Sequence, residues 1–161
     1  HVGGGPFITE ETRDQALLDR LVGRRGDVDA EFGTSTGRRR RMGYFDIPEL
    51  RTATYLNDVD SLVLTKLDLA PRFGETIKVA TGYQTPDGIV DYAPAGSAKQ
   101  LEACSPVYEE LPLWSRDISD ARSFKDLPKK AKHLVNFIED AVGVEVKYIG
   151  VGPGRDQLIK R

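Results

Sequence analysis

The sequence has very little of several residues on which particular folds and sites depend. Its 161 residues include one cysteine, Cys104, which excludes an internal disulfide framework. The sequence shows no signal segment in which basic residues precede an apolar run, and with a single cysteine this indicates a cytoplasmic chain. We expect the thiol of that cysteine to be buried. Two histidines and no cluster of cysteines predict that no metal site is built from this chain alone. No apolar run approaches the roughly 18 residues of a membrane-spanning helix.

Charge of one sign is also not in large excess. The 23 basic and 25 acidic residues give a formal net charge of −2, which argues against nucleic acid as a partner of the whole chain. Positive charge is concentrated instead in one run of arginines, from Arg38 to Arg41. The first residue is His1 and the only methionine is Met42, so we interpret the chain as part of a longer polypeptide.

The periodicity of apolar residues and the positions of glycine and proline predict a single α+β domain over residues 1–161, with mixed helices, short strands and a hairpin. We expect one helix capped by Thr9 or Thr12 and ended by Gly23, a second from Asp46 to near Asn57, and a third from Pro128 to Gly143. Strands are expected over 61–64, 75–84, 89–92, 107–111 and 144–151, with a turn at 86–88. The stretch from 24 to 43 is expected to be a long functional loop.

That loop has the composition of an anion-binding site. Glycines allow backbone N–H groups to approach a ligand, and arginines offer forked donors that match carboxylate or phosphate. The candidate residues are Thr34, Ser35, Thr36, Gly37, Arg38, Arg39 and Arg40. A solvated basic turn or a nuclear-type address is the alternative, and the hydroxyls and glycines before the arginines favour the anion site.

Two further segments suit a purine base. Thr65-Lys66-Leu67-Asp68 follows an apolar strand, where a carboxylate can accept hydrogen bonds from both N1–H and the exocyclic amine of guanine. Gly150-Val151-Gly152-Pro153-Gly154 follows the last expected strand, and proline offers a flat apolar face to a base. An exposed Lys/Asp pair and a strand-ending turn are the alternatives. The sequence has no Gly-x4-Gly-Lys-Ser/Thr loop, so another part would supply phosphate contacts.

These segments occur in an order that resembles the C-terminal portion of the adenylosuccinate synthetase family. The matching stretches cover nearly the whole chain and are 2–7, 31–40, 43–46, 64–68, 106–112, 122–128 and 152–153. The resemblance implies the C-terminal domain of a larger α/β ligase. It also implies a cytoplasmic homodimer that uses GTP and Mg²⁺ to join IMP and L-aspartate into adenylosuccinate, for AMP biosynthesis.

The resemblance further implies a role for each matching residue. For aspartate and IMP these are Val2, Thr34, Ser35, Thr36, Gly37, Arg38, Arg39 and Arg40, and for GTP they are Arg40, Lys66, Leu67, Asp68, Gly150, Val151, Gly152 and Pro153. The family's phosphate loop, Mg²⁺ ligand and catalytic residues lie outside these residues, so we expect no catalytic residue here and no activity from the isolated chain.

Two positions depart from the family's pattern. Gly150 stands where serine is frequent, and Gly154 stands where aspartate is frequent, so the side-chain hydrogen bonds of this loop are expected to differ. The alternative function is a non-catalytic module that binds anions or RNA through the arginine run. RNA binding would weaken steeply with salt, whereas guanine readout would persist and distinguish GDP from ADP.

Overall fold

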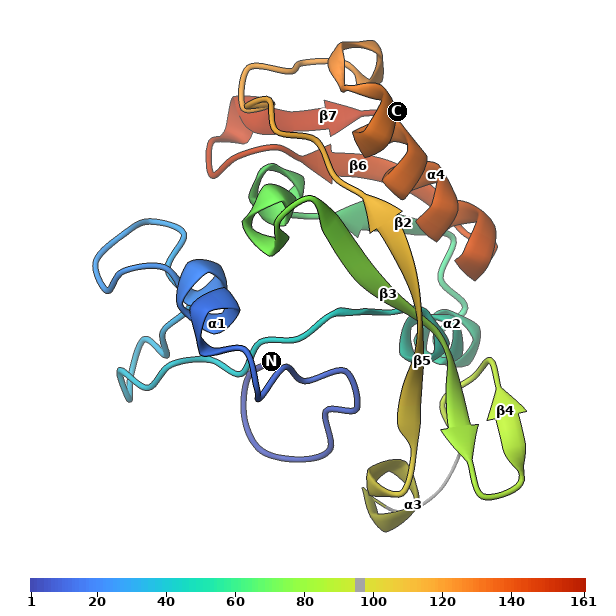
Figure 1. The fold of residues 1–161 in the computed structure, drawn as a ribbon. Helices are drawn as coiled ribbons and strands as arrows, with labels where there is room; N and C mark the ends of the chain where they lie inside the picture. Colours follow the sequence, from blue (N-terminus) through green and yellow to red (C-terminus); the bar gives the residue numbers. More distant parts are fainter. Residues whose placement is uncertain (95–97) are drawn as a thin grey trace. The chain divides into compact units, whose positions relative to one another are not determined.

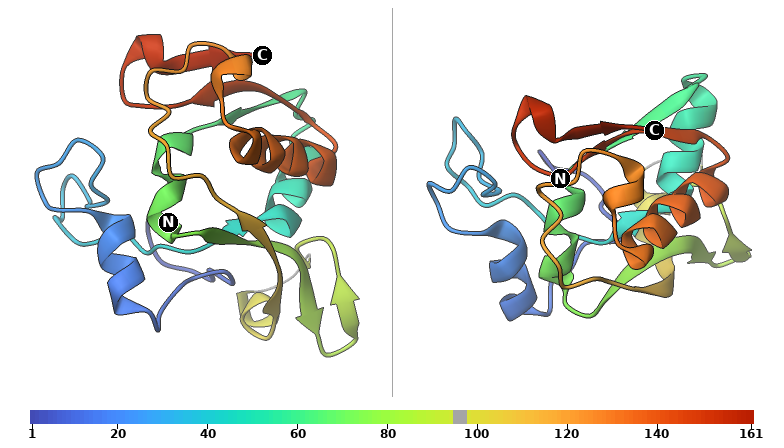
Figure 2. Two further views of the ribbon diagram at one scale, coloured as in Figure 1. Left: turned by 45° about the horizontal axis from the view of Figure 1, so that its top comes forward. Right: turned by 90° about the horizontal axis from the view of Figure 1, so that it is seen from above.

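The computed structural model describes residues 1–94 and 98–161, and their contacts group into two compact units. Unit 1 comprises His1–Glu49 and Lys78–Glu109, and unit 2 comprises Leu50–Ile77 and Glu110–Arg161. Figure 1 and Figure 2 trace the chain through its helices and strands. Helix α2 (Ile47–Leu56) and strands β3 (Thr76–Thr85) and β5 (Ser105–Pro112) each contribute residues to both units.

Unit 1 is organised around β3. Strand β1 (Phe45–Asp46) pairs with β3 in parallel, and β4 (Gly88–Val90) returns antiparallel to it after a tight turn. Strand β5 also pairs with β3. The helices of this unit are α1 (Gln15–Val22) and the short α3 (Ala98–Glu102). Leu17, Leu21, Val79, Ala80 and Tyr83 are buried, so α1 and β3 supply much of its core.

Unit 2 contains a second sheet, in the order β2-β6-β7. Strand β2 (Ser61–Leu64) is parallel to β6 (Glu145–Gly150), and β7 (Leu158–Lys160) is antiparallel to β6. Helix α4 (Lys129–Val142) lies beside β6 (Figure 1). Its buried side chains recur at helical spacing, as expected of an amphipathic helix. They are Ala131, Leu134, Val135, Ile138 and Val142.

Most expected elements are confirmed, together with the α+β class. Helix α4 ends at Gly143, whose φ of +76° is the left-handed conformation that glycine adopts without strain. Helix α2 begins where Asp46 Oδ1 accepts a hydrogen bond from the Glu49 backbone N–H at 3.0 Å, as the sequence predicts. Strands β2, β3, β5 and β6 and the β3–β4 hairpin also lie at the expected positions.

Three expectations are wrong. Asp14, and not Thr9 or Thr12, caps α1, because its Oδ1 accepts the Leu17 N–H at 2.9 Å. The apolar run over 62–64 predicts a buried strand, but β2 is not fully buried, since it lies at an edge of its sheet and Val63 is 57% exposed. Cys104 is half-buried, because it follows the exposed helix α3.

Several short elements have no signal in the sequence. They are β1, α3, β7 and the 3₁₀ turns Leu67–Phe73, Phe124–Asp126 and Arg155–Gln157. The assignment of residues 1–161 to one domain stays a prediction. Over the described ranges, no helix combines the length and apolar character needed to cross a membrane.

Candidate functional site

The arginine-containing loop of unit 1 closes on itself through backbone hydrogen bonds. Arg40 N–H donates to Glu31 O at 2.9 Å, and Gly33 N–H donates to Arg38 O at 2.8 Å. Gly37 N–H donates to Gly33 O at 2.8 Å, and Gly37 takes a φ of +64°. The hydroxyl residues 34–36 therefore stand at the exposed tip of a hairpin-like loop, with the arginines on its returning arm.

Three of the four consecutive arginines have acidic partners. Arg39 pairs with Asp19 at 2.9 Å, Arg40 with Glu31 at 2.6 Å, and Arg41 with Glu10 at 2.6 Å. Figure 1 places α1, which carries Asp19, close to this loop.

Arg38 differs from its neighbours. Its guanidinium has no ion pair or hydrogen bond to the described residues, and the residue is exposed. It is therefore the arginine most available to an incoming anion. The acids beside the other three neutralise much of the run, which disfavours the alternative of a strongly basic surface for RNA.

The loop and the N-terminal residues line one cavity of about 670 Å³, a size suited to a small molecule. The cavity brings together seven of the residues expected to bind aspartate and IMP, all of which belong to unit 1. They are Val2, Thr34, Ser35, Thr36, Arg38, Arg39 and Arg40. Gly37 does not line it, and its carbonyl oxygen accepts a hydrogen bond from the Arg25 guanidinium.

In unit 2, the pairing of β2 with β6 brings the two expected guanine-binding segments together. Leu64 lies opposite Ile149, so both strands end at the same edge of the sheet. A Cβ built on Gly150 would lie 3.5 Å from Thr65 Cα and 3.6 Å from Lys66 N. Segments more than 80 positions apart in the sequence are therefore in contact.

Gly150 itself is not required by the backbone. The distances from its Cβ position are ordinary van der Waals contacts, and its φ is not in the left-handed region. The serine that the resemblance leads us to expect at this position would therefore fit without reshaping the strand end.

Lys66 has an unusual backbone conformation. With φ +60° and ψ +32° it is left-handed, which is uncommon for a residue other than glycine and concentrates at functional sites. Lys66 is exposed, Asp68 is half-buried, and Leu67 between them is 3% exposed. The buried leucine anchors the turn, so Leu67 could contact a ligand only through its backbone.

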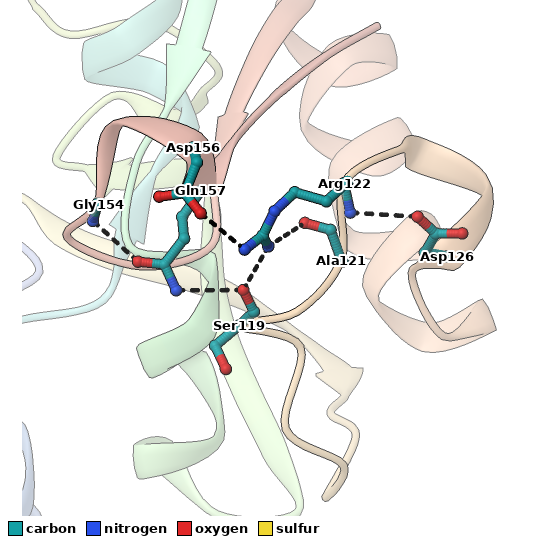
Figure 3. Close-up of polar contacts among 7 residues, drawn as sticks. All are labelled: Ser119, Ala121, Arg122, Asp126, Gly154, Asp156 and Gln157. Atoms are coloured by element: carbon teal, nitrogen blue, oxygen red, sulfur yellow. Dashed lines mark hydrogen bonds and ion pairs between the residues drawn. The ribbon is translucent and has the colours of Figure 1, made fainter.

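The turn after β6 is held by Gln157, a residue for which the sequence pattern gives no signal. Val151 N–H donates to Gln157 O at 2.9 Å, and Gln157 N–H donates to Gly154 O at 3.1 Å. Gly154 N–H donates to the side-chain oxygen of Gln157 at 2.8 Å (Figure 3). Val151 is buried, and Pro153 is exposed at the tip of the turn.

Arg40 belongs to unit 1, whereas the other residues expected to bind GTP belong to unit 2. His133 on α4 is exposed, as expected of a residue outside the apolar face of an amphipathic helix. Among residues 1–94 and 98–161, no three His, Cys, Asp or Glu side chains gather in a way that could hold a metal ion.

Comparison with known proteins gives one consistent family. The family model described as adenylosuccinate synthetase matches residues 1–159. The adenylosuccinate synthetase of Acidothermus cellulolyticus is 45% identical over 159 residues, and that of Neurospora crassa is 43% identical over 162 residues. Each alignment covers 99% of this chain and 36% of the relative, so the chain spans about a third of the length of these relatives.

A solved structure gives the same result. The structure of fully ligated adenylosuccinate synthetase from Plasmodium falciparum superposes with a TM-score of 0.86 at 33% sequence identity. The match covers 100% of this chain and 37% of that one. The likeness therefore extends from sequence to the arrangement of the elements described above.

Proposed function

The chain belongs to the adenylosuccinate synthetase family, and we propose that it is the C-terminal portion of a ligase that joins IMP to L-aspartate with GTP. The product would be adenylosuccinate, a precursor of AMP. We place the enzyme in the cytoplasm and expect a homodimer, as the family resemblance implies. One observation carries the proposal: β2 and β6 bring the Lys66–Asp68 turn and the Gly150–Pro153 turn to one edge of a sheet.

This edge has the groups needed to recognise guanine. The Asp68 carboxylate would accept hydrogen bonds from N1–H and the exocyclic amine, a pair of donors that adenine does not present. The aliphatic stem of Lys66 would lie along the base, and Pro153 would cover it from the other turn. Because the Leu67 side chain is buried, it anchors the backbone from which the polar side chains of Lys66 and Asp68 extend.

The cavity beside the arginine loop would hold the aspartate substrate and approach IMP. The hydroxyls of Thr34, Ser35 and Thr36 and the forked donors of Arg38 suit carboxylate groups. Arg40 would bridge aspartate and the GTP γ-phosphate. To do so, its guanidinium must either keep the Glu31 carboxylate, which it contacts at 2.6 Å, as an additional partner or release it. Forked cations placed at a transferring phosphoryl group stabilise the charge that develops there.

The remaining parts of the reaction would come from the rest of the synthetase. These are the contacts to the GTP phosphates, the Mg²⁺ ligands and the residues that transfer protons. The isolated chain is therefore expected to form no adenylosuccinate.

The test uses the full-length synthetase that contains this chain. Purified enzyme with IMP, aspartate, Mg²⁺ and GTP should form adenylosuccinate, measured by liquid chromatography, and ATP should replace GTP poorly. Asp68→Asn should reduce the preference for GTP over ATP at least tenfold, because an amide cannot accept both guanine hydrogen bonds; a loss of one good hydrogen bond is roughly this size.

Asp140→Asn provides the matched control, since Asp140 is an exposed aspartate on α4 in the same unit. It should leave the nucleotide preference unchanged. A full-length enzyme that forms no adenylosuccinate, or an Asp68→Asn variant with an unchanged GTP preference, would contradict the proposal.

A further inference from the structure

The side chain of Gln157 fills the inner side of the turn that follows β6. A Cβ built on Gly152 would lie 2.4 Å from the Gln157 Cδ, far closer than any real contact. A Cβ on Gly154 would lie 2.7 Å from Asp156 Oδ1 and 3.0 Å from the Gln157 Oε1. Gln157 therefore occupies the space where a side chain on Gly152 would be, whereas the space beside Gly154 is shared between Gln157 and Asp156.

The same glutamine connects the turn to a different segment of unit 2. Its Oε1 accepts the Gly154 N–H at 2.8 Å, while its Nε2 donates to Ser119 O at 3.1 Å. Figure 3 shows the amide between these two groups. Since one end of the amide holds the turn and the other holds residue 119, the position of the turn depends on that segment.

The accepting carbonyl is itself held in place. Arg122 Nη1 donates to Ser119 O at 2.8 Å and to Ala121 O at 3.1 Å, and Arg122 Nη2 pairs with Asp156 at 2.9 Å (Figure 3). Asp126 Oδ2 accepts the Arg122 backbone N–H at 3.1 Å. The Asp156 side chain is 74% exposed, so its ion pair with Arg122 contributes little by itself. The less exposed amide of Gln157 is the main connection.

We propose that Gln157 is a positioning residue for guanine binding: by anchoring the Gly152–Gly154 turn to Ser119, it sets the affinity of the synthetase for GTP. The proposal rests on the function proposed above, in which this turn covers the base. Gln157 acts through the turn and needs no contact with the nucleotide. Without its side chain, the turn would lose the hydrogen bond to Gly154 and the link to Ser119, and it would have to be ordered when GTP binds.

The experiment compares GDP binding by full-length synthetase and its variants in a calorimetric titration. Gln157→Ala should raise the Kd for GDP about tenfold, the size expected for one lost hydrogen bond. Values of kcat at saturating GTP and of KM for aspartate should stay within about twofold, because the change lies in nucleotide binding. A general loss of structure would instead change all of these quantities together.

Two further variants test separately the hydrogen bond from Gln157 to Ser119 and the packing of Gln157 against Gly152. Gln157→Glu keeps an acceptor for the Gly154 N–H but loses the donor to Ser119 O, so its Kd for GDP should also rise. Gly152→Ala should weaken GDP binding in the otherwise unchanged enzyme, because the new methyl group meets Gln157, and should add little in the Gln157→Ala background. The matched control is Gln84→Ala, an exposed glutamine on β3, which should bind GDP like the unchanged enzyme.

The outcomes distinguish the two proposals. An unchanged enzyme that neither binds GDP nor forms adenylosuccinate overturns the proposed function. An unchanged enzyme that binds GDP, together with a Gln157→Ala variant that binds it equally well, overturns the positioning role and leaves the function standing. A Gln157→Glu variant equal to the unchanged enzyme overturns the anchorage to Ser119.

Discussion

Replacing Tyr83 by phenylalanine would remove one buried hydroxyl from unit 1 and leave the aromatic ring. Tyr83 lies on β3 and is 1% exposed. Its hydroxyl donates to Asp46 Oδ1 at 2.6 Å, and the same oxygen accepts the Glu49 N–H that begins α2. Burial and the neighbouring Asp46 raise the pKa of Tyr83 well above its usual value, so the hydroxyl is a donor at every ordinary pH.

The expected loss of stability follows from this single contact. The ring remains, so the buried apolar area hardly changes. A hydrogen bond to a charged group contributes about 1.5–3 kcal/mol. For Tyr83→Phe we expect a loss of about 2 kcal/mol in the free energy of unfolding at neutral pH, which lowers the folded-to-unfolded ratio roughly thirtyfold.

The assay is urea unfolding followed by far-UV circular dichroism, together with hydrogen exchange at the Glu49 amide. Fluorescence of Trp114 would report on unit 2 only, because the single tryptophan belongs to that unit. Tyr108→Phe is the matched control. Tyr108 lies on β5 in unit 1 with its ring edge-on to Tyr44, and its hydroxyl makes no hydrogen bond to the described residues.

The two variants should therefore differ. Tyr108→Phe is expected to change the unfolding free energy by no more than about 0.5 kcal/mol. Equal stability of the two variants, or unchanged exchange at Glu49 in Tyr83→Phe, would refute the argument that the buried hydroxyl stabilises this unit.

Two other predictions concern stability. Burial raises the pKa of the Asp46 carboxyl above 3.8, although its hydrogen bonds oppose this shift, so the folded chain binds the Asp46 proton more tightly than the unfolded chain does. The stability that this proton binding provides is full below pH 3.8 and is lost as pH rises through the folded-state pKa. Asp46→Asn should therefore gain stability relative to the unchanged chain as pH rises from about 3.5 to 7 in parallel urea titrations, and a constant difference would contradict this. Gly143→Ala should cost about 1 kcal/mol in thermal unfolding, because φ is +76° and no atom lies within 4 Å of the new methyl group; an unchanged melting temperature would rule out a backbone cost at this position.

Local sequence determined most of the regular structure. Helix α4 was predictable because its apolar residues recur at helical spacing between Pro128 and Gly143, and both ends have strong local signals. The β3–β4 hairpin was predictable because Pro86-Asp87-Gly88 specifies a turn. Strands β1 and β7 had no such signal, since each has only two or three residues and depends on pairing with a longer strand.

Residue types and their spacing also identified the candidate anion-binding loop and the two segments proposed to bind guanine. They did not determine which arginine is available, because Arg39, Arg40 and Arg41 are paired with acids from other segments, whereas Arg38 makes no ion pair within the described part of the chain. Nor did they indicate Gln157, whose importance comes from a backbone carbonyl 38 positions earlier. Short-range sequence pattern specifies local conformation, whereas interacting residues from different segments meet only through the tertiary fold. In this protein those interactions decide which side chains of each candidate site are available to a ligand and how they are held.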